Sequence, residues 1–289
     1  IAFFFSTSGH SGVDRIVKNL IPAIIGRGYT VDLLQVRRHG PKISEPIEGL
    51  NIIDTGTRHT YLAVAALKRY LQSAQPVVMF SDKDRVNRTA LLANYLAGSK
   101  TRLTLSQGTT VSIDLTHRGW LERQIQRFSM GRLYRYADNV ITVASRVADD
   151  MSAYTGLPRE CINAVPSPYI PQSLLDEEQE SPDLPWFTDK DIPIILGVGE
   201  LSNRKDFATV IRAFAKLRKL KPCRLIVLGK GREQNALSDL AKQLGVQDDI
   251  DLAGFQPNPY RFMAHANLFV TASRWEGLPA VICEALAVG

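Results

Sequence analysis

Short apolar runs alternate with longer amphipathic stretches along almost all of the 289 residues, and this alternation restricts the fold more than any other feature. The short runs have the length and the polar boundaries of buried strands, and the stretches between them have helical spacing. The predicted strands lie at residues 1–6, 30–36, 77–80, 102–106, 139–143, 192–199, 224–229, 250–255 and 267–272. Because strands and helices alternate, we predict parallel sheets whose ligands bind at the carboxyl ends of the strands.

The length of the chain and a polar segment near its middle predict two domains. A chain of 289 residues exceeds the usual size of a single domain. Residues 171–191 are rich in Asp, Glu, Ser and Pro and have little periodicity, which is typical of a linker. We therefore predict an N-terminal domain over residues 1–170, a linker over 171–191 and a C-terminal domain over 192–289.

The last predicted strand turns sharply into a helix that starts with Pro279, a residue favoured at the first helical position. Such a turn presents backbone N–H groups and the positive end of the helix dipole, which favour a phosphate. Glu276 precedes the helix and Glu284 lies more than one turn into it. Acceptors on both sides of a phosphate site suit a nucleotide sugar, which has a diphosphate between two sets of hydroxyl groups. The alternative is that Glu276 caps the helix and Glu284 is solvated.

This motif, from Glu276-Gly277-Leu278-Pro279 to Glu284-Ala285, resembles the signature of the retaining glycosyltransferases of family four. The resemblance extends over most of the chain, through Val198–Ser202 with Lys205–Phe207, Leu228–Gly231 and Gly254-Phe255. It implies the GT-B fold, in which two Rossmann-like doubly wound domains face a cleft. It also implies a hexosyl transfer, with retained configuration, from a nucleotide diphosphate sugar to a glycan or lipid-linked acceptor in cell-surface polysaccharide synthesis.

The resemblance also assigns the groups that hold the donor diphosphate. Lys205, Arg204 and the amides of Gly277 and Leu278 are expected to stabilise the leaving nucleoside diphosphate, so we expect no metal and no other cofactor. Relatives usually have an arginine at the position of Glu200, and a carboxylate cannot hold a diphosphate directly. Three alternatives remain open: Arg204 substitutes, Glu200 orients Lys205, or diphosphate binding is weakened.

Further residues of the site follow from the same resemblance. We expect Glu276 to hold hydroxyls of the donor sugar, Glu284 to accept hydrogen bonds from the ribose and Phe255 to line the base pocket. Gly12 would be the close-approach glycine of the loop near the acceptor. Gln107 stands where many relatives place a histidine, which puts that histidine role in doubt here.

Positive charge is concentrated in the first part of the chain. Residues 1–170 hold 21 Lys and Arg against 13 Asp and Glu, while the remainder holds 14 against 16. No nucleic-acid motif accompanies this charge, so we predict contact with a membrane surface and a cytoplasmic, peripheral location at the inner face of the cytoplasmic membrane. The basic amphipathic segment 118–137 is either a membrane-surface helix or a domain helix with a solvated basic face.

Two other functions remain as alternatives to sugar transfer. One is a non-catalytic nucleotide-sugar-binding subunit, which Glu200 and Gln107 favour. The other is a nucleotide-sugar epimerase of the same architecture, which needs acid and base groups that the sequence does not suggest. The scattered three cysteines and five histidines show no metal-ligand spacing. Because the sequence lacks an initiator Met and stops directly after the motif, we expect it to be part of a longer chain with an incomplete second domain.

Overall fold

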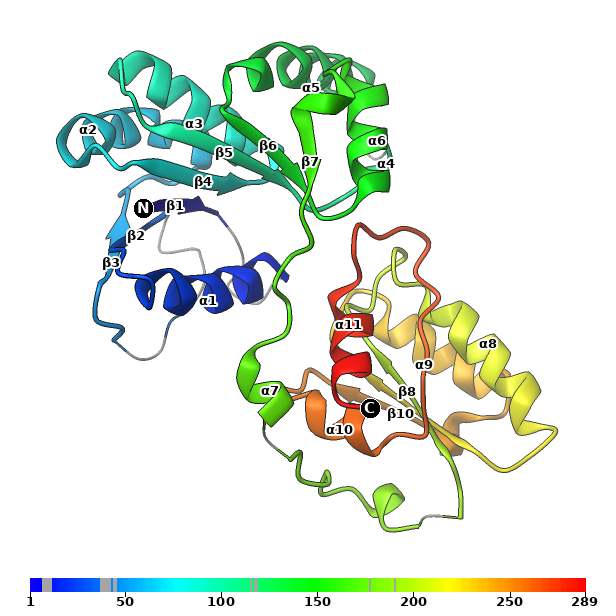
Figure 1. Cartoon of the computed structure of the whole chain (residues 1–289). Helices are drawn as coiled ribbons and strands as arrows, with labels where there is room; N and C mark the ends of the chain where they lie inside the picture. Colours follow the sequence, from blue (N-terminus) through cyan, green and yellow to red (C-terminus); the bar gives the residue numbers. More distant parts are fainter. Residues whose placement is uncertain are drawn as a thin grey trace. The chain divides into compact units, whose positions relative to one another are not determined.

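The computed structural model describes residues 1–6, 12–36, 43, 46–114, 116, 119–176, 178–189 and 191–289. These residues form two compact units, Ile1–Tyr169 and Ile170–Gly289, which Figure 1 colours from blue to green and from green to red. Each unit contains a sheet in which every described strand pair is parallel. The predicted two-domain α/β architecture is therefore confirmed.

The sheet of the first unit has the order β3-β2-β1-β4-β5-β6-β7 in the described part of the chain. Its strands are β1 (Ala2–Phe5), β2 (Val31–Gln35), β3 (Leu50–Asp54), β4 (Val78–Asp82), β5 (Arg102–Gln107), β6 (Asn139–Thr142) and β7 (Ile162–Ala164). The strand order reverses between β1 and β4, and in open α/β sheets such a reversal marks the ligand crevice. The predicted loop after β1 falls on residues 7–11, which lie outside the described residues.

Alternating side chains of β1 build two cores on opposite faces of this sheet. Phe3 and Phe5 pack with Val17 and Ile21 of α1, while Phe4 lies in the other cluster. This alternation follows from the two-residue period of a strand. The helices are α1 (Gly12–Ile25), α2 (Val64–Ala74), α3 (Asp84–Ala97), α4 (Val111–Asp114), α5 (Trp120–Leu133) and α6 (Ser145–Thr155), with single turns at Thr60–Ala63, Tyr134–Tyr136 and Arg159–Cys161.

The second unit repeats this plan with the strand order β10-β9-β8-β11. Its strands are β8 (Ile194–Val198), β9 (Arg224–Leu228), β10 (Ile250–Gly254) and β11 (Leu268–Phe269). Its helices are α7 (Gln172–Asp176), α8 (Phe207–Arg218), α9 (Gln234–Gln243), α10 (Tyr260–His265) and α11 (Ala280–Ala287), with single turns at Pro185–Phe187 and Gln247–Asp249. Residues of α8 and α9 pack in one core cluster, and residues of α10 and α11 pack in the other.

Two segments of the second unit differ in detail from the sequence expectation. The strand expected over residues 267–272 is reduced to Leu268–Phe269, because the chain leaves the sheet early for the turn before α11. Within the segment expected as a linker, Trp186 and Phe187 pack against the core of the second unit, and the Phe187 ring meets Phe262 edge-on at 5.9 Å. The apolar group 184–187 is too short to show a periodicity of its own and lies between polar residues, so the sequence pattern did not reveal this anchor.

Candidate functional site

Three loops are joined by backbone hydrogen bonds at the carboxyl edge of the second sheet. The amide of Leu201, after β8, donates to the carbonyl of Lys230, after β9, at 3.1 Å. The amide of Arg274, after β11, donates to the carbonyl of Arg204 at 2.8 Å. Because parallel strands all end at this edge, segments about 70 residues apart in the chain become neighbours.

Gly229 makes the closest of these approaches. Its φ is +144°, and a Cβ at this position would lie 1.9 Å from the carbonyl oxygen of Gly199. No other residue type fits there without moving one of the two loops. The glycine therefore fixes the distance between the loops that follow β8 and β9.

A second glycine supports the side chain of Lys205. A Cβ at Gly199 would lie 3.2 to 3.4 Å from three carbons of the Lys205 side chain. The aliphatic part of Lys205 therefore lies against bare backbone, and the residue as a whole is buried. Because the aliphatic part of the side chain is buried, the ammonium group of Lys205 can adopt few positions.

The ammonium group of Lys205 and the guanidinium group of Arg204 share one carboxylate, that of Glu276. The Lys205 Nζ lies 2.6 Å from Oε1, and Arg204 Nη1 lies 2.6 Å from Oε2, to which it donates a hydrogen bond. The contact at Oε1 is an ion pair whose angles are not those of a hydrogen bond. All three side chains are at least two-thirds buried, so water screens these charges only partly. Two cations and one anion leave a net positive charge at this edge.

This cluster bears on the alternatives left open for Glu200. Glu200 is exposed, and the ion-pair partner found for Lys205 is Glu276 rather than Glu200. Arg204 stands beside Lys205 on the same carboxylate. The geometry thus favours Arg204 as the second cation of the site.

Two residues that the sequence analysis missed hold this loop in place. Asp206 caps α8 by accepting a hydrogen bond from the amide of Thr209, and Arg274 Nε donates to Asp206 Oδ2 at 3.1 Å. Desolvation acts to raise the pKa of Asp206, but the hydrogen bonds from Arg274 and Thr209 outweigh it and lower the pKa below its usual value. An aspartate before an apolar helix is an N-cap signal, and this signal was available in the sequence.

Most of the other residues that were expected to bind the donor lie along the turn and helix that follow β11. Gly277 and Leu278 are partly buried in the turn, and α11 begins directly after Pro279. Glu284 is fully buried in α11, which rules out the alternative of a solvated side chain. Phe255 follows β10 at the same edge of the sheet, and its ring is half exposed. The structure thus brings Arg204, Lys205 and Glu276 into contact and places Glu284 within the protein interior.

The acceptor-side candidates lie in the first unit. Gly12 is the first residue of α1, and a Cβ there would meet only Tyr169, at an ordinary 3.8 Å. Gln107 is buried at the end of β5, where its Nε2 donates to Thr109 Oγ1 at 3.1 Å. Nearby, burial raises the pKa of Asp82 to about 6, against the lowering effect of a hydrogen bond with Ser106. The sequence analysis did not select Asp82.

Two other kinds of feature are absent from the described residues. Among the described residues, no three His, Cys, Asp or Glu side chains are grouped so that they could hold a metal ion. In the same part of the chain, we find no helix with the length and apolarity needed to cross a membrane.

Comparison with known protein families gives two matches that together cover most of the chain. The family model described as Glycosyl transferase 4-like domain matches residues 11–168. The family model described as Glycosyl transferases group 1 matches residues 178–289. The boundary between the two matches lies close to the boundary between the two units.

Individual proteins are similar to the chain over nearly its whole length. A curated relative from Campylobacter jejuni, the N-acetylgalactosamine-N,N'-diacetylbacillosaminyl-diphospho-undecaprenol 4-alpha-N-acetylgalactosaminyltransferase, is 28% identical over 99% of this chain and 78% of its own. The lipopolysaccharide outer core galactosyltransferase WaaB in its apo form superposes with a TM-score of 0.71 at 16% identity, over 99% of this chain and 78% of its own. Anabaena Alr3699/HepE in complex with UDP-glucose superposes with a TM-score of 0.72 at 15% identity, with the same coverage. The fold is that of the GT-B glycosyltransferases.

Proposed function

The chain belongs to the glycosyltransferases, with a Glycosyl transferase 4-like domain followed by a Glycosyl transferases group 1 region, and from this premise we propose that it transfers a hexose from a nucleotide diphosphate sugar to a glycan or lipid-linked acceptor with retention of configuration. The similar proteins support this substrate class, since one is named for a diphospho-undecaprenol-linked glycan and another is an outer core galactosyltransferase. A structural relative was solved with UDP-glucose, which supports a nucleotide-sugar donor. The proposed pathway is synthesis of a cell-surface polysaccharide.

The contact of Arg204 and Lys205 with one carboxylate is the observation that carries this proposal. A carboxylate presents two oxygens of partial negative charge, as a phosphoryl group does, and each oxygen here meets a different cation at 2.6 Å. The two cations are thus already spaced for a bidentate anion. In the proposed reaction they bind the donor diphosphate and stabilise the charge that develops on it as the glycosidic bond breaks.

Donor binding then requires an exchange at Glu276. In the structure Glu276 pairs with both cations. When the diphosphate takes its place, the released carboxylate becomes an acceptor for hydroxyls of the donor sugar. In the same proposal the amides of Gly277 and Leu278 meet the phosphates, Glu284 accepts from the ribose and Phe255 lines the base pocket.

The acceptor is proposed to bind the first unit near Gly12 and Gln107. Gln107 is an amide, and it supplies both a hydrogen-bond donor and an acceptor where a histidine would supply a titratable ring. This chemistry suits recognition of a sugar hydroxyl. We therefore expect Gln107 itself to add no pH dependence to acceptor binding near neutrality.

The proposal is tested by incubating the protein with a panel of nucleotide diphosphate sugars and measuring release of the nucleoside diphosphate. We expect Lys205→Ala to lower kcat/KM for the donor about 100-fold or more, since it removes a partly buried cation that acts on the leaving group. Lys242→Ala removes an exposed lysine of α9 and serves as the matched control. Equal activity of the two variants would contradict the role of Lys205.

The products separate sugar transfer from the other functions. Retention is checked by NMR of the anomeric proton in the product. A donor epimerised without release of nucleoside diphosphate would indicate an epimerase, and tight donor binding without turnover would indicate a non-catalytic subunit.

A further inference from the structure

Lys230 lies just beyond β9 at the carboxyl edge of the second sheet, and the proposed function leaves it without a role. In the strand order of this sheet, β9 stands between β8 and β10. Lys230 is therefore placed between the two cations proposed to bind the diphosphate and the Phe255 ring proposed to line the base pocket. A donor that spans these two places passes Lys230 with its nucleoside part.

Two glycines fix the backbone on either side of Lys230. A Cβ at Gly231 would lie 2.1 Å from the carbonyl oxygen of Leu201. A Cβ at Gly229 would lie 1.9 Å from that of Gly199. The carbonyl of Lys230 itself accepts a hydrogen bond from the amide of Leu201 at 3.1 Å. The backbone of Lys230 is thus pressed against the loop that follows β8, and it cannot shift without breaking these contacts.

The side chain of Lys230 extends toward β10. Its Cε lies beside Gly254, where an added Cβ would be 3.8 Å away. The amide of Gly229 donates to the carbonyl of Gly254 at 2.8 Å, so the ends of β9 and β10 are held together. Phe255 follows Gly254 directly, and this residue is 49% exposed. The side chain of Lys230 therefore carries its charge toward the strand end that Phe255 follows.

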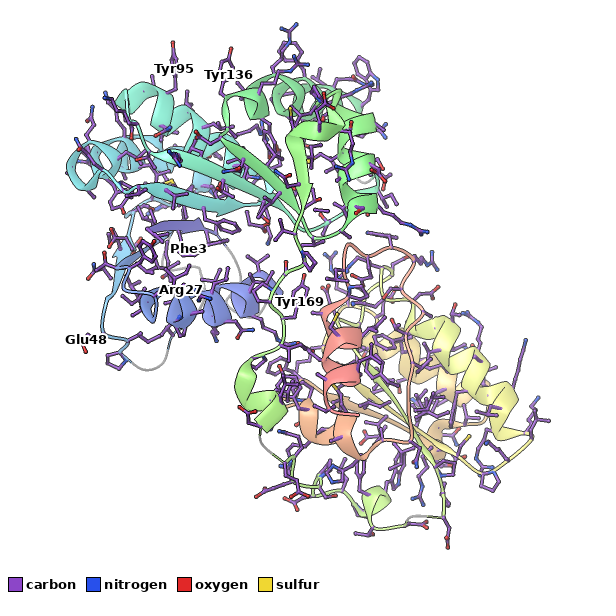
Figure 2. All side chains as sticks on the ribbon, in the orientation of Figure 1. Phe3, Arg27, Glu48, Tyr95, Tyr136 and Tyr169 are labelled. Atoms are coloured by element: carbon purple, nitrogen blue, oxygen red, sulfur yellow. The ribbon has the colours of Figure 1, made fainter. Side chains whose placement is uncertain are left out.

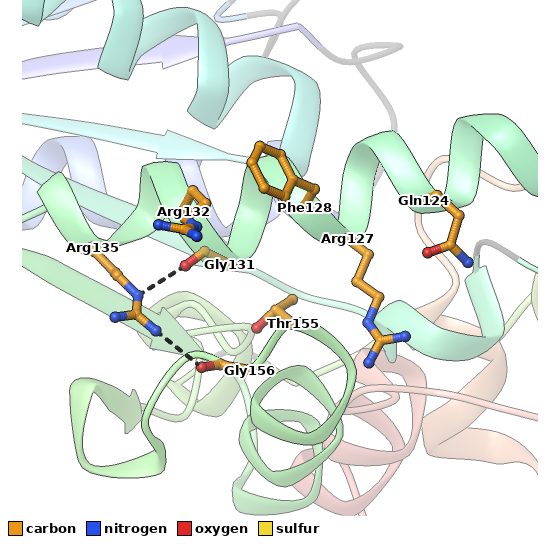
Figure 3. A pocket seen from close by; sticks show the side chains of 8 residues that line it. All are labelled: Gln124, Arg127, Phe128, Gly131, Arg132, Arg135, Thr155 and Gly156. Atoms are coloured by element: carbon orange, nitrogen blue, oxygen red, sulfur yellow. Dashed lines mark hydrogen bonds between the residues drawn. The ribbon is translucent and has the colours of Figure 1, made fainter.

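Exposed arginines of the first unit differ from Lys230 because they have partners within the protein. A groove of about 400 Å³ beside α5 is lined by three arginines, Arg127, Arg132 and Arg135 (Figure 3). The guanidinium of Arg132 lies 5.6 Å from the ring centroid of Phe128, and that of Arg127 lies 5.9 Å from that of Tyr154. The dashed lines in Figure 3 mark hydrogen bonds from the third arginine to two backbone carbonyls.

Exposure alone does not mark a ligand site in this chain. Helix α5 exposes three apolar residues on its outward face, Leu121, Ile125 and Phe128. Figure 2 shows two further exposed side chains that project from the first unit, Tyr95 and Tyr136. Lys230 differs from all of these by its place at the carboxyl edge, where ligands of such sheets bind. Its side chain also has no ion pair, hydrogen bond or aromatic partner among the described residues.

The chemistry of a lysine at this place distinguishes between nucleobases. An ammonium group has three hydrogen-bond donors and no acceptor. Uracil and guanine present a keto oxygen, which is an acceptor, where cytosine and adenine present an amino group, which is a donor. A fixed donor therefore binds a base of the first kind and leaves the amino group of the second kind facing another donor.

We propose that Lys230 selects the base of the donor nucleotide by donating a hydrogen bond to a keto oxygen of uracil or guanine. The inference rests on the proposed function, because it takes the donor to be a nucleotide. It adds discrimination that Arg204 and Lys205 cannot supply, since they bind the diphosphate that every such donor shares.

The test compares nucleotides whose bases carry either a keto or an amino group. Isothermal titration of the full chain measures the Kd of UDP against CDP and the Kd of GDP against ADP. In the pair that binds more tightly, we expect the keto member to bind about tenfold tighter than the amino member.

Three variants locate the origin of this preference. K230M keeps a long side chain but removes every donor, so it should bring the ratio of the two Kd values to about one. K230E replaces the donors by acceptors, so it should reverse the preference. K221M is the matched control and should keep the wild-type ratio, because Lys221 is exposed and precedes the same strand at its opposite end. Circular dichroism checks that each variant is folded.

Kinetics with a nucleotide sugar of the preferred base give a second readout. K230M should raise KM about tenfold and change kcat less than about twofold, because the base lies away from the bond that breaks. The same split should be absent in K221M.

Three results would overturn the inference and leave the proposed sugar transfer in place. The first is equal affinity of the wild-type protein for the keto and amino members of the pair. The second is a ratio in K230M that equals the wild-type ratio. The third is an equal loss of affinity for both members in K230M, which would make Lys230 a further cation for the diphosphate. Absence of binding by all four nucleotides would contradict the proposed function, and this inference with it.

Discussion

At its carboxyl edge the second sheet holds Arg204, Lys205 and Glu276 in direct ion pairs, whereas the first sheet holds a buried network of mostly neutral groups. In that network Ser81 Oγ donates to Asn87 Oδ1 at 2.7 Å, and Asn87 Nδ2 donates to Tyr134 Oη at 3.0 Å. Both edges occupy equivalent places in the same kind of fold. In the proposed function the charged edge binds the diphosphate, whereas the neutral network is closed to solvent, since Ser81, Asn87 and Tyr134 are all buried.

The comparison also separates net charge from local charge. Residues 1–170 are strongly basic as a whole, yet the described cations that share a buried carboxylate lie in the second unit, where acidic residues are in excess. The arginines of the groove beside α5 account for part of the positive charge of the first unit. Net charge therefore indicates which surface attracts an anionic partner over long range, while burial and pairing indicate where a small anion is held.

The largest expected effect concerns the rigid loops of the second unit. Gly229→Ala places a methyl group against the Gly199 carbonyl at a φ of +144°, and it should lower the free energy of unfolding of this unit by about 4 kcal/mol or more. Gly156→Ala in the first unit also has a positive φ but meets open space, so it should cost only about 1 kcal/mol. Calorimetry of thermal unfolding measures the loss of stability in both variants. Equal losses would show that the loops of the second unit do not depend on the close approach of Gly229 to Gly199.

The next effect concerns the neutral network of the first unit. Asn87→Ala removes the acceptor of the Ser81 hydroxyl and the donors to Tyr134 Oη and the Ser106 carbonyl, although Tyr134 keeps Asp84 as a partner, and it should lower the free energy of unfolding by about 2 to 3 kcal/mol. Donor affinity in the second unit should stay the same. Asn163→Ala in β7, at an exposed residue, is the control. Calorimetry measures stability, and titration with the nucleoside diphosphate measures donor affinity. A large drop in donor affinity in Asn87→Ala would show that the two sheet edges are not independent of each other.

The carboxyl group in the first unit gives a smaller effect that depends on pH. Burial raises the pKa of Asp82 to about 6, so the folded unit binds this proton more tightly than the unfolded chain does. The free energy of unfolding should therefore fall as pH rises from about 4 to 6, on the order of 2 kcal/mol, and level off above that range. Asp82→Asn should remove this dependence in urea unfolding, whereas Asp149→Asn, at an exposed carboxylate, should keep it.

The smallest effect is expected at the periphery of the charged cluster. Arg274→Ala removes the ion pair with Asp206, but the Arg274 side chain is half exposed and its amide still donates to Arg204. The loss of stability should be below about 1 kcal/mol, and donor affinity should change less than about threefold. Isothermal titration with the nucleoside diphosphate measures the second quantity. A tenfold loss of affinity would add Arg274 to the groups that bind the donor.

Much of the fold could be predicted because it depends on local patterns. Apolar runs and helical spacing located the strands and helices, and the motif from Glu276 to Glu284 located the turn before α11. The pairing of Glu276 with Arg204 and Lys205 could not be predicted, because it depends on how β8 and β11 align across 72 residues of chain. That the apolar face of α5 points outward could not be predicted either, for a similar reason. The sequence pattern shows that the helix has two different faces, but it does not show which of them packs against the core.

The ion pairs of Glu276 have a consequence for inhibition. In the proposed exchange, sulfate must compete with an internal carboxylate before it reaches Lys205, and it has no hydroxyl group to donate to that carboxylate once it is displaced. A nucleotide sugar brings its own hydroxyl groups, which can donate hydrogen bonds to the displaced glutamate. We therefore expect sulfate to be a poor competitor for this site, because it must displace Glu276 from both cations and leaves that carboxylate without a new partner.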